Sequence, residues 1–183
     1  MDKKKVIEKL YKIRVKAGFL GIILSVILSR SSLLSLAVGT GLILTGLLLR
    51  TWACGHLKKD SQLTTSGPYR HTRNPLYLAN TIIGLGVAAG ANSVWVLLIV
   101  FTYFLIFYPV IIYREKERMR CNFPREYEEY SNRVPLFLLR LKPASGTDKK
   151  KFSWELYQKN KESRALWGGL LFWTAMTLKM LLF

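Results

Sequence analysis

Long uncharged runs alternate with strongly basic segments along this chain of 183 residues. Between Arg73 and Arg114, 40 consecutive residues lack Asp, Glu, Lys, Arg and His. A membrane-spanning helix needs about 20 apolar residues, so this run has room for two. The polar break at 91–93 predicts a tight turn between them. We therefore expect membrane-spanning helices over about 76–91 and 93–113.

Two further apolar segments are long enough to cross a bilayer. Residues 31–49 carry no charge, and Trp52 follows them where amphipathic rings often meet lipid headgroups, which predicts a span over about 31–52. At the far end, residues 165–183 contain a single charge, Lys179, close enough to the terminus to extend into water. We expect another span there.

The first apolar segment, 17–29, has only 13 residues and crosses a bilayer only if the flanking Lys16 and Arg30 extend outward. A cleaved signal peptide is the alternative, but the bracketing charges and the next apolar run favour a retained helical hairpin. Stripes of small residues let helices approach closely in lipid, so we expect the first two helices to pack on each other. The stripes are Ala17, Gly21, Ser25 and Ser29 in one helix and Ala37, Gly41 and Thr45 in the other.

The net charge of +17 is distributed unevenly. If each helical hairpin returns to its starting side, 26 of the 28 Lys and Arg residues lie on that side, leaving Arg30 and Lys179 on the other. This positive-inside distribution predicts an integral membrane protein with a cytosolic N-terminus and 114–164 segment, and a C-terminus on the opposite side. Because topology and attraction to anionic lipids explain the charge, nucleic-acid binding is disfavoured.

These patterns predict an all-α, polytopic membrane helix bundle with about five transmembrane helices, built as a single domain over residues 1–183. Cys54 and Cys121 both fall on the cytosolic side, where thiols stay reduced. With His56 and His71 the only histidines and no ligand cluster around them, no metal site is expected. Beyond the fourth span, Pro124 is expected to interrupt a helix, and residues 138–151 read as a flexible cytosolic loop.

The loop before the third span holds the first candidate site. Gly67 and Pro68 predict a turn, and Pro75 is well tolerated in the first turn of a helix. Arg73 would therefore lie beside free backbone N–H groups at a helix N-terminus, which suits a carboxylate or phosphate. The alternative is that Arg73 and its basic neighbours only determine topology.

Glu115 is the second candidate, because acidic residues are scarce and this one follows the fourth span directly. Since the third and fourth spans form a hairpin, Arg73 and Glu115 return to the same membrane face and could meet. The alternative is a surface ion pair of Glu115 with Arg114 or Arg118, which would contribute little stability.

A set of motif residues follows in order along the chain: Gly67-Pro68-Tyr69, Arg73-Asn74-Pro75-Leu76-Tyr77, Glu115, Met119, Phe123, Tyr127, Tyr130 and Arg133-Val134-Pro135. With these residues the sequence resembles the integral-membrane methyltransferases related to isoprenylcysteine carboxyl methyltransferase and the phospholipid N-methyltransferases. The resemblance covers about residues 42–137. Three positions depart from the family pattern: Asn74 stands in place of His, Lys116 in place of a second Glu, and Pro124 in place of Gly.

The resemblance implies S-adenosylmethionine-dependent methyl transfer to a lipid-like or small hydrophobic acceptor at the cytosolic membrane face. Arg73 and Glu115 are the implied catalytic residues. The alternatives are a nicotinamide-dependent membrane reductase of the sterol-reductase type and a non-catalytic basic bundle that binds anionic lipid or a partner. The cofactor pocket that the resemblance implies is lined by Gln62, Leu63, Thr64, Tyr69, Asn74, Pro75, Leu76, Tyr77 and Glu115.

Overall fold

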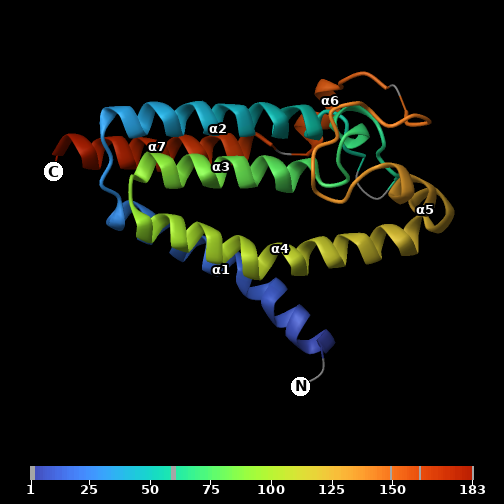
Figure 1. Ribbon diagram of the computed structural model, residues 1–183, viewed down its shortest axis with the longest axis horizontal. Helices are drawn as coiled ribbons and strands as arrows, with labels where there is room; N and C mark the ends of the chain where they lie inside the picture. Colours follow the sequence, from blue (N-terminus) through green and yellow to red (C-terminus); the bar gives the residue numbers. More distant parts are fainter. Residues whose placement is uncertain (1–2, 59–60, 149, 161, 183) are drawn as a thin grey trace.

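A computed structural model describes residues 3–58, 61–148, 150–160 and 162–182. Every regular element in these ranges is a helix, as the sequence predicts. Five helices are long, and three short ones lie near one end of the bundle (Figure 1). The elements are α1 (Lys3–Leu28), α2 (Leu33–Cys54), the 3-10 helix η1 (Gly67–Arg70), α3 (Pro75–Ala91), α4 (Val94–Asn122), α5 (Pro124–Arg133), α6 (Trp154–Lys159) and α7 (Ser163–Leu182).

The central hairpin forms where the charge-free run predicts it. α3 begins at Pro75, and Asn92 ends it with the left-handed φ of 48° that asparagine tolerates better than most residues. α4 extends nine residues past the expected end at 113, into the basic segment. Pro124 starts α5 rather than continuing α4, as expected.

The other helix boundaries differ modestly from the predicted spans. α1 begins at Lys3, so the basic N-terminal residues and the apolar segment 17–28 form one continuous helix. Ser32 caps α2, its hydroxyl accepting from the N–H of Ser35, so this helix starts two residues later than expected. α7 covers the predicted fifth span except Phe183, which lies outside the described residues.

The expectation that the first two helices pack on each other is wrong. α2 instead packs along α3, where glycines bring the two backbones together (Figure 1). A Cβ added at Gly39 would lie 2.7 Å from the carbonyl oxygen of Gly86, and one at Gly46 would lie 2.8 Å from that of Ala79. Gly41, in the predicted stripe, faces open space. The stripe of small residues indicated that α2 packs closely on another helix, but it did not identify which face of α2 is packed or which helix packs against it.

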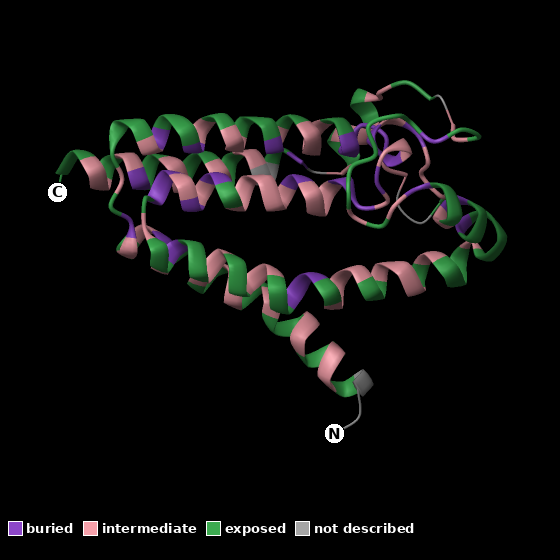
Figure 2. Ribbon diagram, viewed as in Figure 1, coloured by how far each residue is buried: buried purple, intermediate pink, exposed green. Residues whose placement is uncertain are grey.

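The bundle is apolar on the outside. α2 and α4 are the two described helices long and apolar enough to cross a membrane, and only 17% of each apolar window is buried. A core helix of a soluble protein would be mostly buried, whereas the residues of α2 and α4 are mostly intermediate or exposed (Figure 2). α3 and residues 166–182 of α7 are shorter apolar helices. Five spans therefore remain a prediction, with two supported by length and composition.

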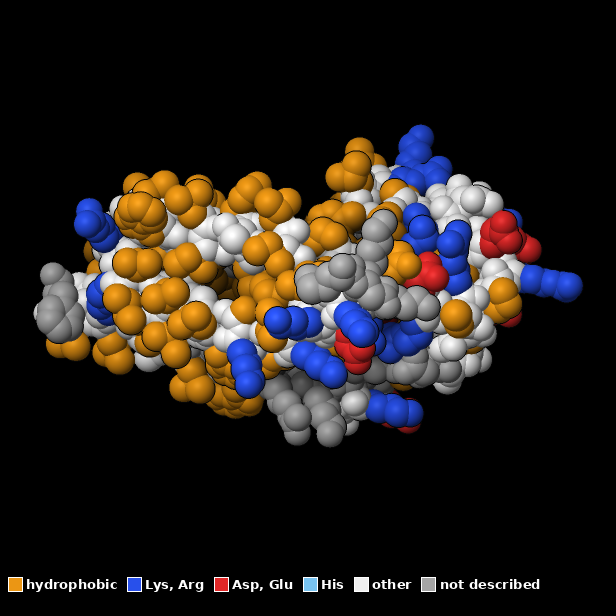
Figure 3. All heavy atoms as spheres, turned by 90° about the horizontal axis from the view of Figure 1, so that it is seen from below, with side chains coloured by type: hydrophobic (Ala, Val, Ile, Leu, Met, Phe, Trp, Pro, Cys, Tyr) orange, Lys and Arg blue, Asp and Glu red, His pale blue; other side chains and the backbone are white. Residues whose placement is uncertain are grey.

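Polar and apolar surfaces separate along the length of the molecule. Figure 3 shows hydrophobic side chains over one half and Lys and Arg side chains gathered toward the other. The hairpin end of the bundle is held by an apolar cluster around Leu36, Val96 and Met176. At the other end a second cluster, around Tyr127 and Val134, joins α5 to the following segment. This second end carries the candidate site.

Lys179 does not simply extend into water as the sequence suggests. Its Nζ donates to the carbonyl oxygens of Val26, Ile27 and Ser29, at 3.0, 2.6 and 2.9 Å. The last carbonyls of a helix lack intrahelical partners and carry partial negative charge, so an ammonium group there is favourable. The lysine thus joins α7 to the end of α1.

We expect Lys179→Met to lower the free energy of unfolding by roughly 2 kcal/mol, because the helix end loses its cation while the side-chain length is kept. Unfolding of the purified protein in detergent, followed by circular dichroism, would measure the loss. Lys159→Met, at an exposed position of α6, is the matched control. Equal stability of the two variants would contradict the assigned role of Lys179.

Candidate functional site

The loop between α2 and α3 turns at a position that only glycine can occupy. Gly67 has a φ of +57°, and an added Cβ would lie 2.4 Å from the ring of His56. His56 is buried, with its Nδ1 3.0 Å from the hydroxyl of Ser66 and its ring edge-on to Phe152. The packed histidine therefore fixes where η1 starts and directs Tyr69 inward.

The start of α3 is tied to the segment that follows α5. The backbone N–H of Arg73, the side-chain amide of Asn74 and the hydroxyl of Thr72 donate to the carbonyls of Pro135, Leu136 and Phe137, at 2.9, 2.8 and 3.2 Å. These bonds join the two halves of the motif, which the hairpin separates in the sequence. They also give Asn74 a structural role, since its Nδ2 is already engaged.

Two buried polar atoms at this junction lack a partner. The hydroxyl of Tyr130 donates to the carbonyl of Tyr69 at 2.7 Å, and Nη1 of Arg73 donates to the hydroxyl of Tyr127 at 3.3 Å. Among the described residues, neither the hydroxyl of Tyr69 nor Nε of Arg73 has a hydrogen-bond partner. Buried polar groups are nearly always satisfied, so unpaired ones next to a cavity point to a ligand.

Burial also determines the protonation of the tyrosines. It raises the pKa of Tyr69 well above its ordinary value, and it raises the pKa of Tyr130 although Arg73 opposes the shift. Both side chains therefore remain neutral phenols at physiological pH. The hydroxyl of Tyr69 is consequently available to donate a hydrogen bond into the cavity.

Glu115 lies at the point where α4 leaves the apolar region. Its Oε2 accepts a hydrogen bond from the hydroxyl of Tyr77 on α3 at 3.2 Å, and its Oε1 pairs with Nη2 of Arg118 at 2.6 Å. The expected alternative, an ion pair with Arg118, is thus present, but the carboxylate is also held across the hairpin. No contact between Glu115 and Arg73 is found among the described residues; both instead face the same cavity.

One cavity of about 280 Å³ gathers the candidate catalytic and cofactor-binding residues that the sequence predicts. It lies between the ends of α3 and α4, the loop after α2, and α5. Arg73 lines it, together with the nine residues of the expected cofactor pocket, which include Glu115. Its lining therefore includes Gln62, Leu63, Thr64, Tyr69, Arg73, Asn74, Pro75, Leu76, Tyr77 and Glu115.

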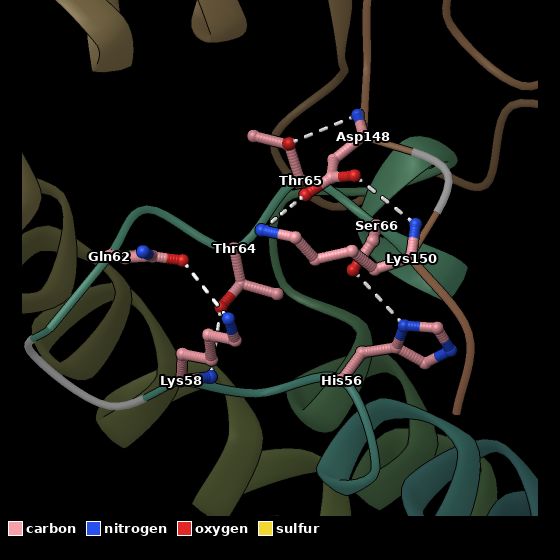
Figure 4. Close-up of polar contacts among 8 residues, drawn as sticks. All are labelled: His56, Lys58, Gln62, Thr64, Thr65, Ser66, Asp148 and Lys150. Carbon is pink, nitrogen blue, oxygen red and sulfur yellow. Dashed lines mark hydrogen bonds and ion pairs between the residues drawn. The ribbon is translucent and has the colours of Figure 1, made fainter. Parts of the chain in front are cut away.

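Two polar residues of the loop before η1, Gln62 and Thr64, accept hydrogen bonds from Lys58 (Figure 4). The Lys58 backbone N–H donates to Oγ1 of Thr64 at 3.0 Å, and its Nζ donates to Oε1 of Gln62 at 3.1 Å. Next to them, Oγ1 of Thr65 accepts from the backbone N–H of Asp148 at 3.3 Å, which ties the loop to the segment before α6 (Figure 4). Gln62, Leu63 and Thr64 of this loop thereby form one wall of the cavity.

A polar cluster on the apolar side of the cavity was not expected. Arg50, near the end of α2, donates from Nε and Nη2 to the two carboxylate oxygens of Glu162 and from Nη1 to Oδ1 of Asn80. Arg50 and Asn80 line the cavity, and Glu162 is only 4% exposed. Asn80, a polar residue within an apolar helix, could have been suspected from the sequence. Glu162 gave no such signal, because its partner lies 112 residues away.

The chain matches the phospholipid methyltransferase family over residues 13–126. This chain belongs to that family. The match spans α1 to the start of α5 and includes Arg73, Glu115 and every residue of the expected cofactor pocket. Together with the exposed apolar helices α2 and α4, membership of the phospholipid methyltransferase family indicates a membrane protein.

Two curated proteins resemble this phospholipid methyltransferase family member over 94 residues. It is 34% identical to the nickel-cobalt-cadmium resistance protein NccN of Alcaligenes xylosoxydans xylosoxydans. It is 36% identical to the cobalt-zinc-cadmium resistance protein CzcN of Cupriavidus metallidurans. The matched segment covers 50% of this chain but only 44% and 43% of those relatives. No solved structure matches the chain significantly.

Gly67→Ala should destabilise the site strongly, because the new Cβ would collide with His56 and φ would become strained. We expect a loss of roughly 2 kcal/mol or more in the free energy of unfolding. Thermal unfolding in detergent would measure it. Gly168→Ala is the matched control, since nothing lies within 4 Å of a Cβ added there. Equal unfolding temperatures for the two variants would rule out this packing role.

Stability should fall as the pH drops below about 6.5, in part because of His56. Burial lowers the pKa of His56 below its ordinary 6.5, so below that pH the unfolded chain binds a proton that the folded protein resists. The contribution of this residue is therefore fully present above pH 6.5 and is lost on acidification. Unfolding temperatures measured between pH 5 and 8 should show a smaller acid loss in His56→Gln. An identical pH profile in the variant would contradict the assignment.

Proposed function

We propose that this protein transfers a methyl group from S-adenosylmethionine to a lipid-like or small hydrophobic acceptor at the cytosolic face of a membrane. The observation that carries the proposal is the cavity where the two motif halves meet, with the unpaired Tyr69 hydroxyl and Arg73 Nε buried at its wall. Membership of the phospholipid methyltransferase family supports the reaction class.

The donor set of the cavity suits S-adenosylmethionine. The rings of Tyr69 and Tyr77 offer faces that attract a sulfonium cation. Glu115 can accept from the donor's ammonium group or ribose hydroxyls, and Gln62 and Thr64 add polar groups at the rim. The bound cofactor would supply the methyl group as an electrophile, and the protein would hold it facing the acceptor.

Arg73 is the residue proposed to hold the acceptor. A guanidinium binds a carboxylate or phosphate with two parallel hydrogen bonds and so fixes its orientation. The backbone of Arg73 is held by Pro135 and its Nη1 by Tyr127, so little of its freedom has to be lost when an acceptor binds. Such orientation next to the methyl group is the main contribution expected from the protein.

The surroundings of Glu115 bear on the type of acceptor. Both of its carboxylate oxygens already accept hydrogen bonds, from Tyr77 and Arg118. Each oxygen keeps a second lone pair, and these are the sites proposed to hold the donor, so the described lining residues offer no separate carboxylate to take a proton from an amine. A carboxylate or thiolate acceptor needs no base, so we infer that such acceptors fit this site better than an amine.

The proposed orientation follows from charge. The loop that carries Arg73 and the segment from Arg114 to α6 hold many of the cations and lie at one end of the bundle (Figure 1). The positive-inside rule assigns such an end to the cytosol, where S-adenosylmethionine is made available to enzymes. The acceptor would approach from the lipid, between apolar helices.

The names of the two relatives refer to metal resistance, but we do not propose a metal site. Among the described residues, no group of three or more His, Cys, Asp and Glu side chains is placed to hold a metal ion. We infer instead that any part in metal tolerance would act through the methylated membrane component.

Arg73→Ala and Glu115→Gln should each lower methyl transfer by about 100-fold or more without loss of fold, because each removes a group that orients a substrate. The assay follows label from methyl-labelled S-adenosylmethionine into extracted native lipids, which also identifies the acceptor. The matched controls are Arg125→Ala, at an exposed position, and Glu117→Gln, at a partly exposed position. Calorimetry with S-adenosylhomocysteine and with NADPH would separate this proposal from a reductase. Binding of NADPH alone, or full turnover in both variants, would overturn it.

A further inference from the structure

An ion pair between Arg50 and Glu162 lies at the wall of the cavity, with Glu162 buried. A guanidinium and a carboxylate are costly to remove from water unless they are paired and hydrogen-bonded. Here the carboxylate engages two nitrogens of Arg50 and accepts from the thiol of Cys54 at 3.1 Å, while Asn80 takes a third nitrogen of Arg50. The pair thus joins α2 to the residue before α7, and it has further hydrogen-bond partners on α2 and α3.

Glu162 comes from a part of the chain that the family match does not cover. The match ends at residue 126, and Glu162 directly precedes α7. Nearby, the side-chain amide of Asn160 donates to the carbonyls of Cys54 and Leu57, at 2.9 and 3.0 Å. The segment before α7 is therefore fastened to the end of α2 by two independent sets of contacts, directly behind the cavity wall formed by Arg50.

The charge of the cavity makes this pairing important. Among the described residues, its lining contains five cations and a single carboxylate, Glu115. Glu115 is itself paired with Arg118. A sulfonium ligand would be repelled by an unbalanced guanidinium at the wall, and the repulsion is strong where water is excluded. Glu162 removes that repulsion at Arg50. The five cations are Arg50, Lys58, Arg73, Lys116 and Arg118.

We propose that Glu162 is a positioning residue of the donor site: by holding and neutralising Arg50, it lets the cavity accept the cationic methyl donor. The inference rests on the proposed use of S-adenosylmethionine. The inference gives the segment before α7 a role in the site. Glu162 acts through Arg50 and does not contact the ligand.

The test compares binding of S-adenosylmethionine with that of S-adenosylhomocysteine, which lacks the methyl group and the sulfonium charge. Glu162→Gln keeps the shape of the side chain but leaves Arg50 without a counterion. Its affinity for S-adenosylmethionine should fall about tenfold further than its affinity for S-adenosylhomocysteine. Calorimetry on the full chain in detergent gives both constants, and Glu155→Gln, an exposed carboxylate on α6, is the control.

A second pair of variants moves the counterion to the other side of Arg50. Asn80→Asp adds a carboxylate at the position of the amide oxygen that Arg50 already contacts, and it should raise the preference for S-adenosylmethionine. The double variant Asn80→Asp with Glu162→Gln restores one counterion and should return the preference to that of the wild type. Because Arg50 stays paired in both, these variants should fold even if Glu162→Gln alone does not.

The outcomes separate this inference from the proposed function. A wild-type protein that binds neither ligand would refute the proposed function and the inference with it. If the wild type binds both ligands but the variants weaken both equally, the pair only stabilises the fold and the inference is wrong. A preference that falls in Glu162→Gln, rises in Asn80→Asp and returns in the double variant would support it.

Discussion

The candidate site depends on the contacts between residues 72–74 and the three carbonyls of 135–137. These hydrogen bonds hold the start of α3 against the segment after α5. Each bond contributes only about 1 kcal/mol, but together they position a guanidinium that would otherwise be free in solvent. The side chain of Arg73 can be half-buried next to a cavity because its backbone is fixed on both sides. The hairpin of α3 and α4 brings the two segments to the same end.

The sequence predicted the elements that local chemistry determines. The charge-free run, Pro75 and Asn92 together specify the central hairpin. The start of α3 and the turn agree closely with the structure, whereas α4 continues nine residues past its expected end. It could also be predicted that Arg73 and Glu115 return to one face, because a hairpin leaves little choice. The family pattern then selected residues that do line one cavity. The assignment of that cavity to a cofactor remains a prediction.

What the sequence could not provide is the choice between distant partners. A stripe of small residues on a helix does not say which helix fills it, so the pairing of α2 with α3 was missed. The sequence predicted a flexible loop around Arg140 and Ala144. In the structure, the backbone N–H groups of these two residues donate to the carbonyls of His71 and Arg70. The pairing of Arg50 with Glu162 is of the same kind, since no local pattern identifies a contact across 112 residues.

The central claim is that the cavity between α3, α4 and the loop after α2 holds the methyl donor. An experimental structure of the protein with S-adenosylhomocysteine tests this most directly. The account predicts that the ligand lies between Tyr69, Tyr77 and Glu115, with a polar group of the ligand or of an acceptor lipid beside Nε of Arg73. Ligand bound elsewhere, or a cavity that stays empty at saturating ligand concentration, would contradict it.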